Sequence, residues 1–70
     1  MYRLFLYERP TDGQRVEIFL RPSPQGTVYV IREGNSHDSV TPDRPDVDRY
    51  RTQLREQGFM LRHESARTNA

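Results

Sequence analysis

The residues of this chain that could do chemistry stand side by side at Ser36, His37, Asp38 and Ser39. They are the residue types of a hydrolase triad, in which a nucleophile, a base and an orienting acid must converge in space. Neighbouring residues of one short loop cannot converge on each other in that way. The sequence therefore predicts no catalytic residue.

No metal or cofactor site is predicted either. His37 and His63, with Asp38 or Glu64, could bind a metal only if two distant segments met, and nothing in their spacing indicates this. The chain has no cysteine, which excludes thiol chemistry and disulfide bonds. Its glycines are isolated at turns and form no phosphate-binding loop. We expect a protein that is not an enzyme and needs no cofactor.

The basic residues have an unusual composition, because all eleven are arginine. A codon bias would account for this simply, whereas a functional reason would be that arginine forms planar, bidentate contacts. Arg44, Arg51 and Arg55 recur along a predicted helix, where they could contact phosphates or form a solvated face. The net charge of +1 argues against polyanion binding by bulk electrostatics.

The elements that must position these residues begin with three strands. Alternating apolar and polar residues predict them at residues 2–8, 15–21 and 27–32. An Asp-Gly pair at residues 12–13 and a proline-containing stretch at residues 22–26 mark the turns between them. Such short connections predict an antiparallel meander. Residues 35–44 are polar and show no period, so we expect a surface loop there.

One amphipathic helix is predicted from Arg44 to Gln57. Asp43 is expected to cap its start, and Gly58 is expected to follow its end. The apolar stripe of this helix consists of Val47, Tyr50 and Leu54. On the opposite face we expect Arg44, Asp48, Arg51 and Arg55.

The segment after the helix is ambiguous. Phe59 to Arg62 either adds a short fourth strand or packs back over the core, since four residues carry little periodic information. Residues 63–70 have no apolar anchor and are expected to form a flexible tail. The prediction is a single α+β domain at residues 1–62, a three-stranded antiparallel meander followed by one helix (βββα). Seventy residues lie near the lower limit for independent folding, so burial against a partner would help.

Side-chain alternation sorts the strand residues onto two faces. We expect an aliphatic face to form the core under the helix, with Leu4, Leu6, Val16, Ile18, Leu20, Val28 and Val30. We expect the other face to be exposed and to bind a partner through Phe5, Tyr7, Arg15, Phe19, Arg21, Tyr29 and Ile31. Aromatic residues and arginine are enriched at interfaces. Cross-strand pairs that only stabilise a solvated sheet would explain the same pattern.

Two functions follow from these faces. The first is a non-enzymatic protein-binding module that docks through the aromatic and arginine face or through a sheet edge. Small accessory chains of this kind include phage-type inhibitors of larger host complexes, such as anti-CRISPR proteins, and the likeness is one of size and simplicity. A homodimer that joins two such faces is a further option.

The alternative is a nucleic-acid-binding βββα domain. Its order of elements is similar to that of several plant and integrase-type DNA-binding domains that lay a sheet in the major groove. Arg3, Arg15, Arg21 and Arg32 would contact bases or phosphates, and exposed aromatic residues would stack on unpaired bases. No apolar run approaches the length of a membrane span, and the first residues do not resemble a signal peptide. We expect a cytoplasmic protein.

Overall fold

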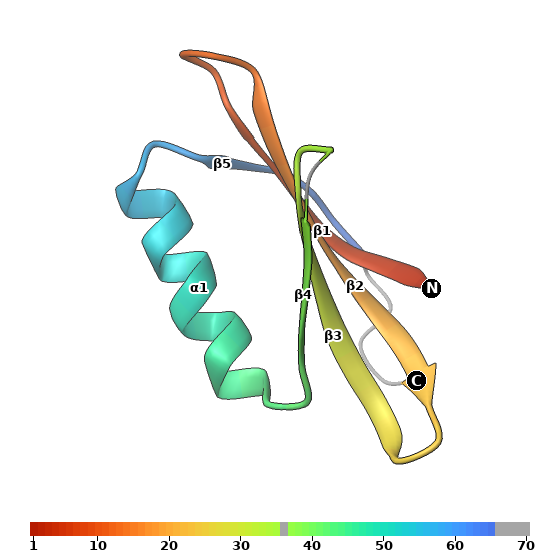
Figure 1. Ribbon diagram of the computed structural model, residues 1–70. Helices are drawn as coiled ribbons and strands as arrows, with labels where there is room; N and C mark the ends of the chain where they lie inside the picture. Colours follow the sequence, from red (N-terminus) through yellow and green to blue (C-terminus); the bar gives the residue numbers. More distant parts are fainter. Residues whose placement is uncertain (36, 66–70) are drawn as a thin grey trace.

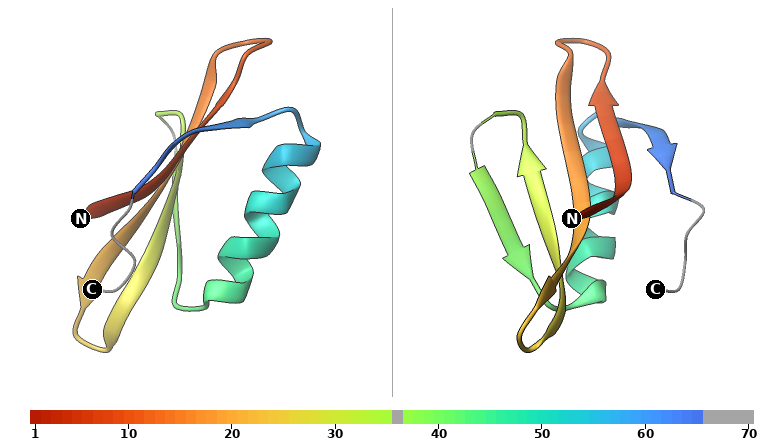
Figure 2. Two further views of the ribbon diagram at one scale, coloured as in Figure 1. Left: turned by 180° about the vertical axis from the view of Figure 1, so that it is seen from behind. Right: turned by 90° about the vertical axis from the view of Figure 1, so that its right-hand side faces the viewer.

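The computed structural model describes residues 1–35 and 37–65, which form one antiparallel sheet with a helix on one side (Figure 1). The elements in chain order are β1 (Tyr2–Arg9), β2 (Gln14–Ser23), β3 (Gly26–Glu33), β4 (His37–Thr41), α1 (Arg44–Glu56) and β5 (Met60–Glu64). The strands lie in the order β4-β3-β2-β1-β5, and all neighbouring pairs are antiparallel. Figure 2 shows β4 and β5 at opposite edges, with α1 behind the sheet. The α+β class is confirmed.

The three predicted strands of the meander are confirmed as β1, β2 and β3. Residues 10–13 connect the first pair, and residues 24–25 connect the second. Gly13 and Gly26 have φ angles of 73° and 120°, which residues other than glycine rarely adopt. Glycine at these two positions lets the chain reverse within a few residues.

A further strand, β4, lies where the sequence predicts a loop. It pairs with β3 at the sheet edge, with Asp38 opposite Arg32 and Val40 opposite Val30. Residues 38–40 are exposed, so β4 lacks the buried apolar alternation by which strands are recognised. The loop prediction was wrong for His37–Thr41, because pairing with β3, and not burial, holds this segment in place.

The helix α1 confirms the predicted helix to within one residue at its end. Asp43 occupies the N-cap position with extended backbone angles, but its side chain makes no capping hydrogen bond. The side chain of Thr41 makes the hydrogen bonds at the start of the helix. Its Oγ1 accepts a hydrogen bond from the amide of Asp43 (3.2 Å) and donates one to the carboxylate of Asp46 (3.0 Å). Gly58, with φ of 91°, follows the helix as predicted.

The segment after the helix combines the two expected arrangements. Phe59 packs in the core, and its amide donates a hydrogen bond to the carbonyl of Leu54 (2.9 Å). The next residue, Met60, begins β5, which pairs with β1 at the sheet edge. The chain therefore returns from the helix and adds a strand beside the one with which it began.

The flexible tail was predicted to begin at residue 63, but the ordered sheet extends beyond that residue. His63 and Glu64 belong to β5, and the amide of Ser65 donates a hydrogen bond to the carbonyl of Leu4 (2.9 Å). The rest of that tail, residues 66–70, lies outside the described residues.

The core lies between α1 and one face of the sheet, and this face differs from the predicted one. Buried core residues are Leu4, Phe5, Tyr7, Val16, Ile18, Ile31, Val47, Leu54 and Phe59. The assignment was right for β2, whose Val16 and Ile18 are in the core. It was also right for Leu4 near the start of β1. It was wrong for the rest of β1 and for β3, because Phe5, Tyr7 and Ile31 lie in this core, whereas Leu6, Val28 and Val30 belong to the other side.

The strand register explains this exchange of faces. Both hairpin loops, residues 10–13 and 24–25, contain an even number of residues, so Ile18 pairs with the odd-numbered Phe5 and Ile31. Directly paired residues share a face, and a shift of one residue moves a whole strand to the other face. A bulge between Arg3 and Phe5 shifts the register near the start of β1.

Candidate functional site

The residues predicted to form one binding surface are divided between the two sides of the sheet. Those on the helix side are Phe5, Tyr7, Ile31 and the half-buried Tyr29. The exposed fraction of Tyr7 is only 2%. Those on the other side are Arg15, Phe19 and Arg21. Instead of one aromatic surface, the structure has two separate candidate regions.

The first region is the side of the sheet away from α1, which we call the open face. Its members on β1 to β4 are Arg3, Leu6, Glu8, Arg15, Glu17, Phe19, Arg21, Val28, Val30, Arg32, Asp38 and Val40. Leu6 and Val30 are buried, and Phe19 is half-buried. The guanidinium carbon of Arg32 lies 5.1 Å from the ring centroid of Phe19. Apolar side chains on this face are thus partly covered by charged neighbours.

Charges on the open face are largely paired with each other. Arg3 contacts Glu17 at 2.9 Å, and Arg32 contacts Asp38 through two hydrogen bonds of 2.9 and 3.1 Å. The hydrogen bonds from Arg32 hold the pKa of Asp38 below its usual range. Arg15 and Arg21 are exposed and form no ion pair with residues 1–35 or 37–65.

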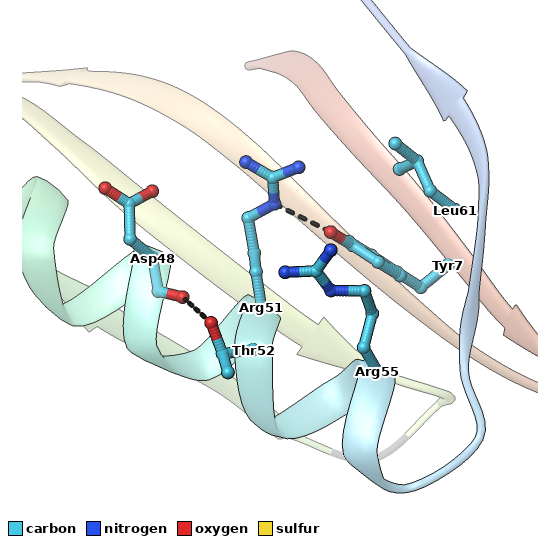
Figure 3. A pocket seen from close by; sticks show the side chains of 6 residues that line it. All are labelled: Tyr7, Asp48, Arg51, Thr52, Arg55 and Leu61. Carbon is cyan, nitrogen blue, oxygen red and sulfur yellow. Dashed lines mark hydrogen bonds between the residues drawn. The ribbon is translucent and has the colours of Figure 1, made fainter.

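The second region lies between α1 and the strands β1 and β5, and we call it the helix groove (Figure 3). It is a cavity of about 270 Å³. Its lining residues are Tyr7, Asp48, Arg51, Thr52, Arg55 and Leu61. Figure 3 shows the guanidinium groups of Arg51 and Arg55 gathered beside the hydroxyl of Tyr7.

Arg51 lies between the helix and the sheet. Its guanidinium carbon is 3.7 Å from the ring centroid of Phe5, and its Nε donates a hydrogen bond of 2.7 Å to the hydroxyl of Tyr7. The planar guanidinium can stack on one aromatic ring and still donate in its own plane to another. Arg51 is therefore part of the packing between α1 and β1.

Arg44 also lies toward the sheet, so the predicted opposite face was wrong for Arg44 and Arg51. Its guanidinium carbon is 5.9 Å from the ring centroids of both Phe5 and Tyr29, and its Nε donates to Asp48 at 3.0 Å. Hydrogen bonds to Asp48 and Tyr29 raise the pKa of Arg44. Arg55 is exposed at the end of the same row.

Helical spacing explains the position of these arginines. Arg51 follows the buried Val47 by four residues and precedes the buried Leu54 by three. Because a step of four residues turns a helix by only about 40°, Arg51 flanks the apolar stripe and does not oppose it. That spacing is visible in the sequence, and it could have identified Arg51 as a residue facing the sheet.

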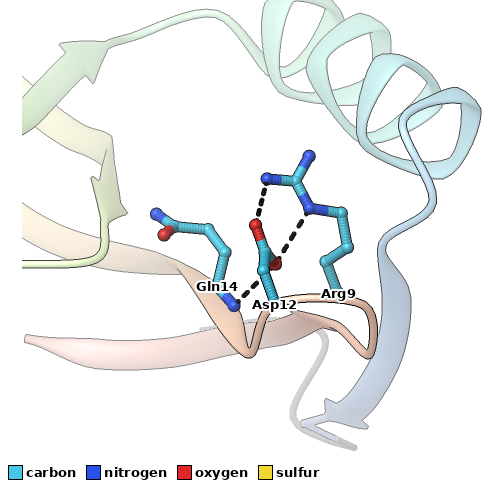
Figure 4. A network of polar contacts seen from close by, with 3 residues as sticks. All are labelled: Arg9, Asp12 and Gln14. Carbon is cyan, nitrogen blue, oxygen red and sulfur yellow. Dashed lines mark hydrogen bonds and ion pairs between the residues drawn. The ribbon is translucent and has the colours of Figure 1, made fainter.

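A network of polar contacts among Arg9, Asp12 and Gln14 stabilises the turn between β1 and β2 (Figure 4). Arg9 donates to the carboxylate of Asp12 at 3.1 and 2.7 Å, and the amide of Gln14 donates to the same carboxylate at 3.1 Å. The hydrogen bonds from Arg9, followed by the one from Gln14, lower the pKa of Asp12 to about 2. Arg9 also lies over the ring of Phe59, 4.8 Å from its centroid.

The residue types that suggested chemistry are not assembled into a site among the described residues. Asp38 is engaged by Arg32, and Ser36 lies outside that part of the chain. Across residues 1–35 and 37–65, no group of three or more His, Asp or Glu side chains could hold a metal ion. None of the helices in this part of the chain is sufficiently long and apolar to span a membrane.

Comparison of the chain with protein-family models, with curated proteins and with solved structures found no match. Functional inference therefore depends on the open face and the helix groove themselves.

Proposed function

We propose that this chain is a non-enzymatic protein-binding module that docks on a larger protein through the open face. The observation that carries the proposal is the pairing of charges on this face, between Arg3 and Glu17 and between Arg32 and Asp38. A surface that binds nucleic acid uses uncompensated positive charge to displace counterions. A face whose charges are mostly compensated suits a protein surface of mixed polarity better.

The remaining side chains of the open face indicate the chemistry of the partner. Phe19 combines with Arg32, and aromatic residues and arginine are the types enriched at the energetic centres of interfaces. Arg15 and Arg21 are exposed without an ion pair among the described residues, so acidic groups opposite them would complete the charge pairing. The partner we propose is a protein surface that carries acidic residues. An accessory or inhibitor chain would need no more than such binding.

The test is co-purification of the tagged full chain from cells that produce it. An open-face variant, Phe19→Ala with Arg21→Glu, is compared with a matched control on the exposed side of α1, Gln53→Ala with Arg49→Glu. A partner retained by the wild type and by the control, but lost from the open-face variant, would support the proposal. Equal retention by all three chains, or self-association as the only binding seen in sedimentation, would contradict it.

Nucleic acid is the second candidate, and one observation favours it. Arg15 and Arg21 are exposed on the open face and form no ion pair in the described part of the chain. Fluorescence anisotropy with labelled single- and double-stranded oligonucleotides tests this alternative. If it holds, affinity falls linearly with salt on logarithmic axes, and Arg15→Gln reduces the slope by about one. Absence of binding at low salt would eliminate nucleic acid as the ligand.

A further inference from the structure

The helix groove brings together hydrogen-bond donors that have no acceptor among residues 1–35 and 37–65. Arg51 uses Nε for Tyr7, which leaves its two terminal nitrogens without a partner there. Tyr7 accepts that bond, so the proton of its own hydroxyl remains available although the side chain is 98% buried, its exposed fraction being 2%. The side chain of Arg55 forms no hydrogen bond or ion pair within the same described ranges.

The groove carries a positive charge, because two arginines line it and only one acidic residue does. Asp48 is the one acidic residue of the lining, and its carboxylate is already engaged by Arg44 at 3.0 Å. Arg51 and Arg55 lie one helical turn apart, and like charges at this spacing destabilise a helix. An anion bound between them would remove that repulsion and accept their free hydrogen bonds.

The number of donors selects the kind of anion. The cavity of about 270 Å³ lies near the lower end of the roughly 300–1,000 Å³ of ordinary ligand pockets, so it has room for a phosphoryl group. A phosphate monoester carries a charge of about −1.5 to −2 and three acceptor oxygens, which matches two guanidinium groups and a hydroxyl. A carboxylate offers only one charge and two oxygens.

We propose that the helix groove binds the phosphoryl group of a phosphate monoester, held by Arg51, Arg55 and the hydroxyl of Tyr7. Free phosphate and a nucleoside monophosphate share this chemistry. An attached organic group would extend from the groove over Leu61, whose side chain lines it and is 41% exposed. The site is on the opposite side of the sheet from the open face, so this proposal does not depend on the proposed protein partner.

The test is an NMR titration of the full chain at constant ionic strength with three probes: inorganic phosphate, AMP and acetate. We expect saturable shifts of the backbone amides of Tyr7, Arg51 and Arg55, with a dissociation constant of about 0.1–10 mM for the phosphate-containing probes. Tighter binding of AMP than of phosphate would show that the organic group adds contacts, as expected over Leu61, whereas equal binding would show that the phosphoryl group alone is recognised. Acetate should bind much more weakly than either.

Two arginine variants make the result specific. Arg55→Gln removes a side chain that forms no ion pair with the described residues, and it should weaken phosphate binding at least about tenfold. Arg49→Gln removes an equal charge from the same helix at a residue paired with Asp46 outside the groove, and it should change binding less than about twofold. Unsaturable shifts, equal binding of acetate, or equal effects of the two variants would overturn the proposal.

Discussion

The guanidinium of Arg51 lies over the ring of the core aromatic residue Phe5, with 3.7 Å between the guanidinium carbon and the ring centroid. Because Phe5 is buried under α1, this contact is a part of the packing between helix and sheet and not a surface interaction. The same arginine donates to Tyr7 on the same strand. A charged residue thus packs on the sheet from a position that flanks the apolar stripe of the helix.

Replacing Arg51 by lysine should destabilise the fold. Lysine keeps the charge but loses the planar stack on Phe5 and the in-plane hydrogen bond to Tyr7. We expect the free energy of unfolding to fall by about 1–2 kcal/mol, measured by urea denaturation. The control is Arg55→Lys, an exposed site one turn away, where the change should stay within about 0.5 kcal/mol. Equal effects of the two substitutions would show that Arg51 has no packing role.

The sequence was sufficient to predict the elements that have strong local patterns. The three strands of the meander and the helix follow from alternation, turn residues and the helical stripe, and the structure has all of them. The strand β4 could not be found in this way, because its exposed residues carry no apolar period and its position depends on pairing with β3. A local sequence pattern does not predict long-range strand pairing of this kind.

Assignment of side chains to faces failed for a reason that lies in the loops. Alternation within one strand fixes which residues share a face, but the relation between two strands depends on loop length. Ser23 pairs with Gly26 across a two-residue loop, residues 24–25, which places even-numbered residues opposite odd-numbered ones. Arg9 likewise pairs with Gln14 across residues 10–13, so Phe5 and Tyr7 on β1 and Ile31 on β3 lie in the core and not on the predicted binding surface.

The corrected faces can be tested with two small truncations. Ile31, assigned to the exposed face from the sequence, is buried in the structure, so Ile31→Val should lower the free energy of unfolding by about 0.5–1.5 kcal/mol. Val40, on the open face of β4, is 51% exposed. Val40→Ala removes more carbon atoms, yet it should change stability by less than about 0.5 kcal/mol. A larger loss for Val40→Ala in thermal or urea unfolding would contradict the observed faces.

At the start of α1, the side chain that makes the hydrogen bonds is that of Thr41 and not that of Asp43, which was expected to cap the helix. Thr41 links the amide of Asp43 to the carboxylate of Asp46, whereas the side chain of Asp43 makes no capping hydrogen bond. Thr41→Val keeps the shape of the side chain and removes these bonds, so it should cost about 1 kcal/mol in urea unfolding. Asp43→Ala should cost less than Thr41→Val. The reverse order would mean that Asp43 caps the helix in solution.

The β1–β2 turn predicts a dependence of stability on acid. The pKa of Asp12 in the folded chain, about 2, lies below its ordinary value of 3.8, mainly because Arg9 donates to the carboxylate. A lowered folded pKa stabilises the fold above the unfolded value, and this contribution is lost as pH falls from about 4 through about 2. NMR titration of the side-chain carboxyl of Asp12 should give a midpoint near the lower value, and Arg9→Gln should raise it.

A stability comparison isolates this contribution from those of the other carboxylates. Asp12→Asn can still accept the hydrogen bond from the amide of Gln14, but it has no charge to titrate. The difference in urea midpoint between wild type and Asp12→Asn should be largest above about pH 4 and should shrink as the pH approaches about 2. Because the carboxylate is exposed, added salt should reduce the difference at every pH. A difference that stays constant between these pH values would mean that the contact of Asp12 with Arg9 does not persist in solution.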